Sequence, residues 1–217
     1  MLSTLLKCTS GALSYEIDIQ RFSSTGFTYN YSNLGGVVPS DVVYFFMATA
    51  SGGFIDPSTP SGYTSIAVSE LELSNRLVYR EIDGSEGSSV TLSGTSTGVK
   101  MSVVAIKVSN QEGFTNGVSS SNNSSSLSVA GVTATEGLLF LLGTARDRDS
   151  PYTLEFNGTQ ADGMTLLEKQ DTDGTADSML GVVYVENITA GSTGTRTLSL
   201  INAGGDDTLA GVILNIY

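Results

Sequence analysis

The feature that most constrains this chain is a succession of short β-type segments separated by clusters of turn-forming residues. In the first of them Tyr15, Ile17 and Ile19 alternate with polar side chains, among them Asp18, as in a strand with one face in water. Further candidate strands are residues 41–49, 62–68, 76–82, 89–92, 101–108, 138–144, 164–168, 180–186, 196–201 and 209–217. Gly, Pro, Asn, Asp and Ser fill almost every gap. This spacing predicts an all-β fold, a two-sheet antiparallel β-sandwich.

The composition agrees with that fold class. The 217 residues suffice for one well-packed domain or two small ones. Charged residues make up 15% of the chain, below the ~25% that is usual, and 25 residues are Gly. Long surface helices need many charged residues and few glycines, so helix-rich folds are disfavoured.

The charge balance excludes several classes of partner. The chain has 10 Lys and Arg against 22 Asp and Glu, a net charge of −12. Such a chain has no nonspecific attraction for nucleic acid or for an anionic membrane. The longest apolar stretch, residues 42–48, is far shorter than the ~20 residues that cross a bilayer. We therefore expect no nucleic-acid partner and no membrane partner.

The start of the chain predicts a retained N-terminus. Residues 1–8 contain no basic segment ahead of their apolar residues and no apolar run of the length that a secretion signal needs. Cys8 is the only cysteine, so no internal disulfide can form, which suits synthesis in a reducing cytoplasm.

The second half of the chain predicts a repeat of the first. Five β-type blocks recur in the same order, beginning at residues 41 and 137, 62 and 163, 78 and 183, 91 and 197, and 104 and 211. The offset drifts, as loops of different length would make it do. We predict two pseudo-repeated halves, about 36–110 and 132–217, after an N-terminal arm at residues 1–13.

The Ser/Asn-rich segment 118–126 joins these halves and predicts a crossover that burial cannot order. It is either a domain boundary or a link within one sandwich. The strands at 41–48 and 138–142 are apolar on both faces and need cover on both sides. We therefore expect the halves to pack together as a single domain over residues 1–217.

The chemistry of catalysis is poorly represented. The chain has no His, which removes the commonest general base and excludes Ser-His-Asp and Cys-His arrangements. Zinc-binding and phosphate-binding motifs are absent from the sequence. The acidic residues Asp147, Asp149, Asp171, Asp173, Asp177, Asp206 and Asp207 lie in turn-like sequence, where solvated turn residues are the first interpretation and cation ligands the alternative. We expect no catalytic, cofactor-binding or metal-binding residues, no cofactor and no enzyme activity.

Two segments are candidates for contact with a partner. The candidate interface residues are Leu2, Leu5, Leu6, Phe27, Tyr29 and Tyr31. The three aromatic residues alternate along one strand face, and such a stripe is either core or a stacking surface for a sugar or a protein. The three leucines precede the first strand, and they either fray or dock as an arm on a neighbouring subunit.

Several short motifs carry a family resemblance. They are Ser40–Val43 (SDVV), Pro60–Thr64 (PSGYT), Leu77–Tyr79, Val90–Leu92, Val103–Ile106 and the glycine-rich Ala190–Thr195 (AGSTGT). Together, over residues 36–217, they resemble the jelly-roll virion structural proteins of tailed bacteriophages, which include decoration and tail-associated proteins. Ser40 stands where that family has Gly, and Tyr63 where it has Trp. The resemblance implies a jelly-roll-like sandwich and a place in the virion.

Within that family, a compact acidic domain without coiled-coil heptads or collagen-like repeats suits a capsid decoration or cement protein on the outer head surface better than a fibre shaft. Its expected partners are the major capsid protein or other virion proteins, and it is expected to form a homo-oligomer. The alternative is a receptor-binding or carbohydrate-binding module of the tail, at a fibre tip or baseplate, with a glycan as partner. A glycan-degrading enzyme is a third hypothesis.

Overall fold

The computed structural model describes residues 13–22, 26–50, 57–69, 73–94, 100–117, 120–148, 150–159, 162–175 and 177–217. These residues form β-strands, one short 3-10 helix, η1 (Tyr31–Leu34), and no α-helix. The prediction of an all-β antiparallel fold is confirmed. In these ranges no helix has the length and apolar character to span a membrane.

The first large sheet contains five antiparallel strands, all of which overlap segments predicted from the sequence. In spatial order they are β1 (Ser14–Phe22), β7 (Lys100–Ser109), β3 (Val42–Ala50), β5 (Ser74–Glu81) and β4 (Thr64–Ser69). The central strand β3 pairs with β7 on one side and with β5 on the other. β1 and β4 are therefore the edges of this sheet.

The second large sheet also has five strands along its width. In spatial order they are β14 (Thr165–Gln170), β15 (Ser178–Ile188), β12 (Gly137–Asp147), β18 (Thr208–Ile216) and β8 (Phe114–Asn116). A further short strand, β9 (Ser120–Asn122), pairs with the first part of β18. β14 forms one edge, and β8 and β9 share the other.

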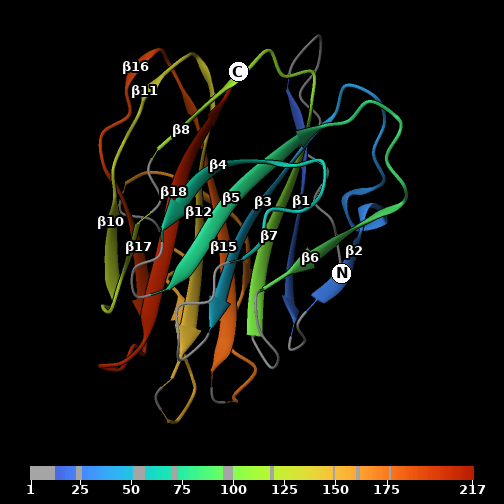
Figure 1. The fold of residues 1–217 in the computed structure, drawn as a ribbon. Helices are drawn as coiled ribbons and strands as arrows, with labels where there is room; N and C mark the ends of the chain where they lie inside the picture. The colour runs from blue at the N-terminus through green and yellow to red at the C-terminus, as the bar shows by residue number, and fades with distance from the viewer. Residues whose placement is uncertain are drawn as a thin grey trace.

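The two large sheets pack face to face and enclose the main apolar core (Figure 1). From the first sheet and the residue before β5 come Ile19, Val42, Tyr44, Phe46, Ala48, Leu73, Leu77, Val104, Ile106 and Val108, and from the second come Phe140, Leu142, Met179, Val183, Ala210, Val212, Leu214 and Ile216. Within each strand these side chains occupy alternate positions, as one face of a sheet requires. Their burial is the dominant favourable contribution to folding and holds the two sheets together.

The outer face of each large sheet is apolar as well, and a small sheet covers it. On the first sheet lie η1 and the pair β2 (Gly26–Asn30) and β6 (Ser89–Ser93). On the second sheet lie β10 (Ser126–Val129), β17 (Arg196–Ile201) and β13 (Glu155–Phe156), with a separate pair of β11 (Thr133–Ala134) and β16 (Gly191–Ser192). The prediction of two sheets is thus incomplete: the described residues form four layers, because β3 and β12 carry apolar side chains on both faces.

The polar face predicted for the first strand is not in water. Asp18 is 7% exposed and accepts hydrogen bonds from the Tyr29 hydroxyl at 2.8 Å and from Gln20 Nε2 at 2.9 Å. The expectation fails because β2 covers this face of β1. A carboxylate that is removed from water needs hydrogen-bond donors in place of water, and Tyr29 and Gln20 provide them.

The segment 118–126, predicted as a crossover without regular structure, contains β9 and the first residue of β10. Residues 120–122 pair with β18, and Asn122 Nδ2 donates a hydrogen bond to the Ser126 carbonyl at 2.9 Å. Backbone hydrogen bonds to β18 order residues 120–122 even though their small polar side chains bury little apolar surface, because the N–H and C=O groups of most residues can extend a sheet. Residues 118–119 lie outside the described residues.

Replacing Gly181 with Ala is expected to lower the free energy of unfolding by about 1–3 kcal/mol. Gly181 lies on β15 where the two large sheets meet, and a Cβ there would stand 2.5 Å from Ile19 Cγ2 and 3.2 Å from Ser102 Oγ. The sheets would have to separate locally. Gly205→Ala is the control, because a Cβ at Gly205 meets no atom within 4 Å. Urea unfolding measures both variants, and equal stabilities would contradict the close approach at Gly181.

Candidate functional site

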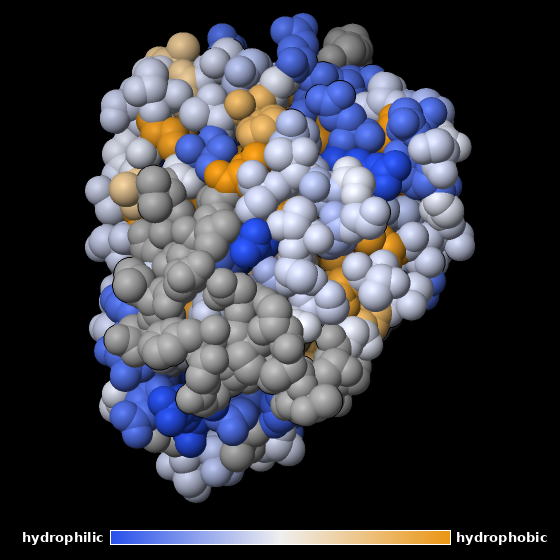
Figure 2. Space-filling model, viewed as in Figure 1, coloured by the Kyte–Doolittle hydropathy of each residue, from blue (hydrophilic) through white to orange (hydrophobic). Residues whose placement is uncertain are grey.

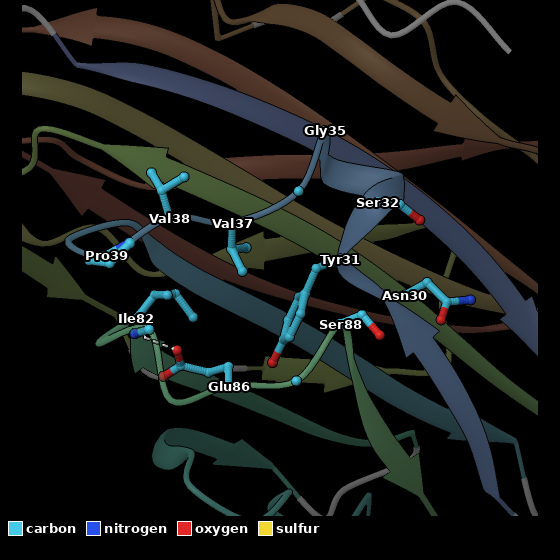
Figure 3. Close-up of a pocket in the computed structure, with 13 residues that line it drawn as sticks. Asn30, Tyr31, Ser32, Gly35, Val37, Val38, Pro39, Ile82, Glu86 and Ser88 are labelled. Carbon is cyan, nitrogen blue, oxygen red and sulfur yellow. Dashed lines mark hydrogen bonds between the residues drawn. The ribbon is translucent and has the colours of Figure 1, made fainter.

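The face of the molecule shown in Figure 2 has no single broad apolar patch outside the grey atoms. Outside the grey atoms, the hydrophobic residues in Figure 2 form separate small patches. A groove of about 920 Å³ lies where β3 begins and β5 ends, and we call it the outer groove (Figure 3). It is lined by Asn30, Tyr31, Ser32, Gly35, Gly36, Val37, Val38, Pro39, Ile82, Gly84, Glu86, Gly87 and Ser88. Its volume lies within the range of about 300–1,000 Å³ that small-ligand sites occupy.

One wall of the outer groove is the turn that ends η1. Gly35 has a φ of 69° and Gly36 a φ of 86°, both in the left-handed region that favours glycine. The Gly36 N–H donates a hydrogen bond to the Tyr31 carbonyl at 2.9 Å, and Lys107 Nζ donates to the Gly36 carbonyl at 2.9 Å. These bonds tie the turn to β7. The chain then leaves toward Val38, which is 62% exposed at the groove.

The charged side chain in the outer groove is fully paired. The Glu86 carboxylate accepts hydrogen bonds from the Gly84 N–H at 2.9 Å and the Asp83 N–H at 3.2 Å, and it lies 2.8 Å from Arg80. Burial opposes its ionisation, but backbone hydrogen bonds and Arg80 hold its pKa below the usual range of glutamate. The lining residues therefore present neutral amide, hydroxyl and backbone groups beside an apolar rim.

The motif Pro60–Thr64 lies behind this groove and is used for packing. The Tyr63 N–H donates a hydrogen bond to the Pro60 carbonyl at 3.1 Å, and Gly62, with a φ of 79°, allows the turn. The turn inserts Tyr63 into the outer core, where its hydroxyl lies 3.0 Å from that of Tyr31. Burial raises the pKa of both hydroxyls. Through Tyr63, this motif thus anchors the fold.

Of the two alternatives that the sequence leaves open for the aromatic stripe, Tyr29 and Tyr31 take the core. Tyr29 is 1% and Tyr31 2% exposed, so neither ring is available to stack on a sugar or a partner. Phe27 is half-buried and stacks on Phe22. These side chains are buried because the inner face of β2 packs on the first large sheet. The leucine candidates Leu2, Leu5 and Leu6 lie outside the described residues.

The buried turn carboxylates serve the backbone. Asp147 and Asp207 are each 1% exposed. Asp147 accepts a hydrogen bond from the Leu154 N–H at 3.1 Å, and Asp207 accepts one from the Arg148 N–H at 2.8 Å. In the described part of the chain no three His, Cys, Asp or Glu residues are grouped to hold a metal ion. Asp149, another turn candidate, lies outside the described residues.

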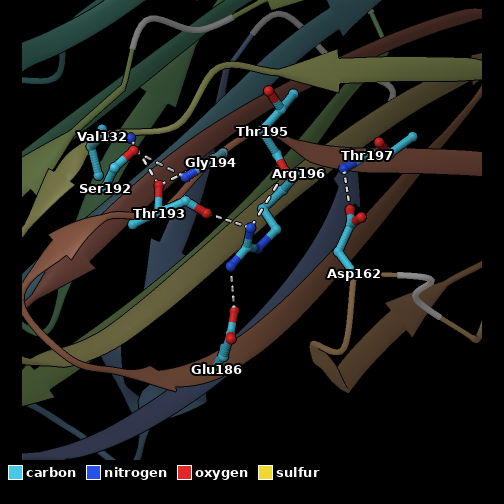
Figure 4. Close-up of polar contacts among 9 residues, drawn as sticks. All are labelled: Val132, Asp162, Glu186, Ser192, Thr193, Gly194, Thr195, Arg196 and Thr197. Carbon is cyan, nitrogen blue, oxygen red and sulfur yellow. Dashed lines mark hydrogen bonds and ion pairs between the residues drawn. The ribbon is translucent and has the colours of Figure 1, made fainter.

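The glycine-rich turn before β17 is clamped by Arg196 (Figure 4). The Arg196 guanidinium lies 2.8 Å from Glu186 Oε2 and donates a hydrogen bond to the Thr193 carbonyl at 2.5 Å. Thr193 in turn exchanges two hydrogen bonds of 2.9 Å with Val132, one through its N–H and one through its hydroxyl. These bonds connect the glycine-rich turn to β15, to the start of β17 and to the segment before β11.

A second groove, of about 690 Å³, opens between the large sheets at the same end of the sandwich. Glu81, Asp83 and Glu112 make its lining acidic, and Tyr217 closes part of it. The Tyr217 N–H donates to the Gly113 carbonyl at 3.1 Å, and the Tyr217 ring leaves no room for a side chain at Gly113.

No protein-family profile, curated protein or solved structure matches this chain. The geometry of the grooves is therefore the basis for assigning a ligand class. That geometry favours the outer groove as a place for a neutral ligand, because its one carboxylate is paired and its other polar groups are uncharged.

Glu86→Gln is expected to lower stability at about pH 7 and to have little effect at about pH 3. The folded protein lowers the pKa of this carboxyl from its usual 4.5. The stability it contributes is therefore complete above about pH 4.5 and is lost as the pH falls through the lowered pKa. Thermal unfolding across this range measures the effect, with exposed Glu81→Gln as the control. A deficit that persists unchanged in acid would contradict the assignment.

Proposed function

We propose that this chain is a non-enzymatic structural protein of a tailed-bacteriophage virion, most simply a capsid decoration protein on the outer surface of the head. The observation that carries the proposal is the four-layer packing, which uses both faces of the central strands for core. Loops and sheet edges are left for contact, and these are the surfaces by which a rigid block attaches to neighbours. The PSGYT and AGSTGT motifs, with their resemblance to virion jelly rolls, support the same role.

The proposal includes one jelly-roll-like sandwich built from two pseudo-repeated halves, and strand order supports the repeat. The order β1-β7-β3-β5-β4 in the first sheet corresponds to β8-β18-β12-β15-β14 in the second. In each, the central strand pairs on one side with the last strand of its half, β7 or β18. In each, the outer face is covered by a pair formed from the same positions in the chain, β2 with β6 and β10 with β17.

The irregularities of the strands support the repeat more specifically than their order does. The pairing register of β4 shifts at its third residue, Ile66, and that of β14 shifts at its third residue, Leu167. Each of these strands follows a glycine in the left-handed region, Gly62 with a φ of 79° and Gly163 with a φ of 83°. A bulge is a specific device of a fold, so its recurrence at one position is hard to obtain by chance.

The register also adjusts the correspondence expected from the sequence. Leu77 and Val183 share the inter-sheet face, as do Val104 and Val212. The blocks that begin at residues 78 and 183, and at 104 and 211, are therefore displaced by one residue relative to the sequence pairing. A slip of one residue exchanges the two faces of a strand, so the burial pattern decides between the alignments.

Contacts between the halves are reciprocal. Tyr15 of β1 packs edge-on against Phe140 of the second sheet, with ring centroids 5.3 Å apart and an interplanar angle of 87°. Phe114 of β8 packs edge-on against Tyr44 of the first sheet at 5.6 Å and 82°. Such exchange of equivalent contacts is what an approximate two-fold axis between the halves would produce.

The decoration role predicts a large number of copies in each particle. In purified virions of the phage that encodes this chain, quantitative mass spectrometry should find hundreds of copies, scaling with the major capsid protein. About a dozen copies would contradict the head location and favour the tail. Absence of the chain from particles that contain all other structural proteins would contradict the virion role itself.

The alternative, a carbohydrate-binding module of the tail, is favoured by one observation, the outer groove. Its apolar rim can pack on the faces of sugar rings, and its neutral polar groups can bond hydroxyls. Titration with neutral oligosaccharides, followed by amide NMR, should then shift Val37, Val38 and Ser88. Val38→Asp should weaken binding at least about tenfold, or about 1.4 kcal/mol. Ile201→Asp is the matched control, because Ile201 is 43% exposed and outside the groove. Unshifted resonances would contradict this alternative.

A further inference from the structure

A third groove, of about 420 Å³, lies on the flank where β1 of the first sheet approaches β14 and β15 of the second. We call it the β14 groove. It is lined by Leu13, Tyr15, Leu138, Gly163, Thr165, Leu167, Val185, Glu186 and Asn187. Five of these side chains are apolar or aromatic and only partly buried at the rim of the main core. Glu186 is held by Arg196 at 2.8 Å, so its charge is paired.

The β14 groove lies between two sheet edges. β1 is the outermost strand of the first sheet, and β14 is the outermost strand of the second. Among the described strands none pairs with the outer edge of either. Natural proteins cover or blunt such edges, because an open apolar edge invites association.

On the opposite flank of the sandwich, residues of β8 contact the edge of the first sheet. There Phe114 packs against Tyr79, with ring centroids 4.8 Å apart, and Asn116 Nδ2 donates a hydrogen bond to the Ile66 carbonyl at 3.1 Å. Val42, at the position that corresponds to Leu138, is 4% exposed, whereas Leu138 is only half-buried. A groove opens at both flanks, but the apolar residue at its rim is more fully buried at Val42 than at Leu138.

We propose that the β14 groove binds the N-terminal segment of the same molecule, residues 1–12, through Leu2, Leu5 and Leu6. This segment lies outside the described residues, and the chain enters the described part at Leu13, which itself lines the groove. Three leucines within the first six residues match an apolar groove of small volume. The inference concerns the chain itself and goes beyond the proposed virion role.

Chain length favours a docking within one molecule. Six residues, Lys7 to Ala12, separate Leu6 from Leu13, and a flexible linker of that length has a root-mean-square span of about 13 Å. The leucines are therefore held near the groove at an effective concentration in the millimolar range or above. A second copy would have to exceed that concentration to compete.

The single cysteine provides the test. A nitroxide spin label attached to Cys8 of the full chain should broaden the methyl NMR signals of Leu138, Leu167 and Val185, and reduction of the nitroxide should restore them. Ile66, at the corresponding position on the opposite flank, is the internal control and should stay sharp. Equal broadening of Leu167 and Ile66 would overturn the proposal.

Two variants separate docking from mere tethering of the label. The triple change Leu2→Asp, Leu5→Asp and Leu6→Asp should reduce the broadening of Leu167 severalfold, whereas Ser3→Asp with Thr4→Asp, which adds charge but keeps the leucines, should not. Unchanged methyl signals elsewhere in both variants show that the rest of the protein remains folded. Retention of full broadening in the triple variant would overturn the proposal.

A mixing experiment separates one molecule from two. Spin-labelled chain without isotopes is mixed with isotope-labelled Cys8→Ser chain that carries no spin label. The proposal expects the methyl signals of Leu138, Leu167 and Val185 to stay sharp in the mixture. Broadening there would show that the segment docks on a second copy, and the intramolecular docking would be wrong.

Discussion

The structure depends on one interface, the apolar contact between the inner faces of the two large sheets. Every other feature is arranged around it. Alternate residues of β3, β7, β12 and β18 form this contact. Gly181 has no side chain, so the second sheet can approach Ile19 of the first closely at that point. Only every second side chain of a strand points into this contact. On the central strands the other side chains, which point to the outer face of the sheet, are apolar as well. The outer layers follow from that requirement.

The outer layers also explain how polar groups are distributed. Asp18 faces β2 rather than water, so it is held by Tyr29 and Gln20. Burial and then the charge of Asp18 raise the pKa of the neighbouring Glu168 carboxyl. Carboxylates in turns, such as Asp83, Asp173 and Asp207, accept hydrogen bonds from nearby N–H groups. Polar side chains of the described residues therefore work mainly for the fold.

A four-layer block of this kind is suited to rigid attachment. Ring contacts tie the two large sheets together on both flanks, Tyr15 with Phe140 on one and Phe114 with Tyr44 on the other. The halves nevertheless differ at their flanks, where one groove is acidic and partly closed by Tyr217 and the other is apolar and bordered by Leu13. These differences give one molecule two different flanks.

The sequence by itself determined the fold class and nearly all of the long strands, because alternation and turn residues are local properties. It did not reveal β8, β9, β10, β11, β13 or β16, which are two to four residues long and form where a neighbouring strand offers hydrogen-bond partners. It likewise left Tyr29 and Tyr31 open between core and contact surface. Only the tertiary structure decided that question and the number of layers, because whether a second face is covered depends on contacts between residues far apart in the chain.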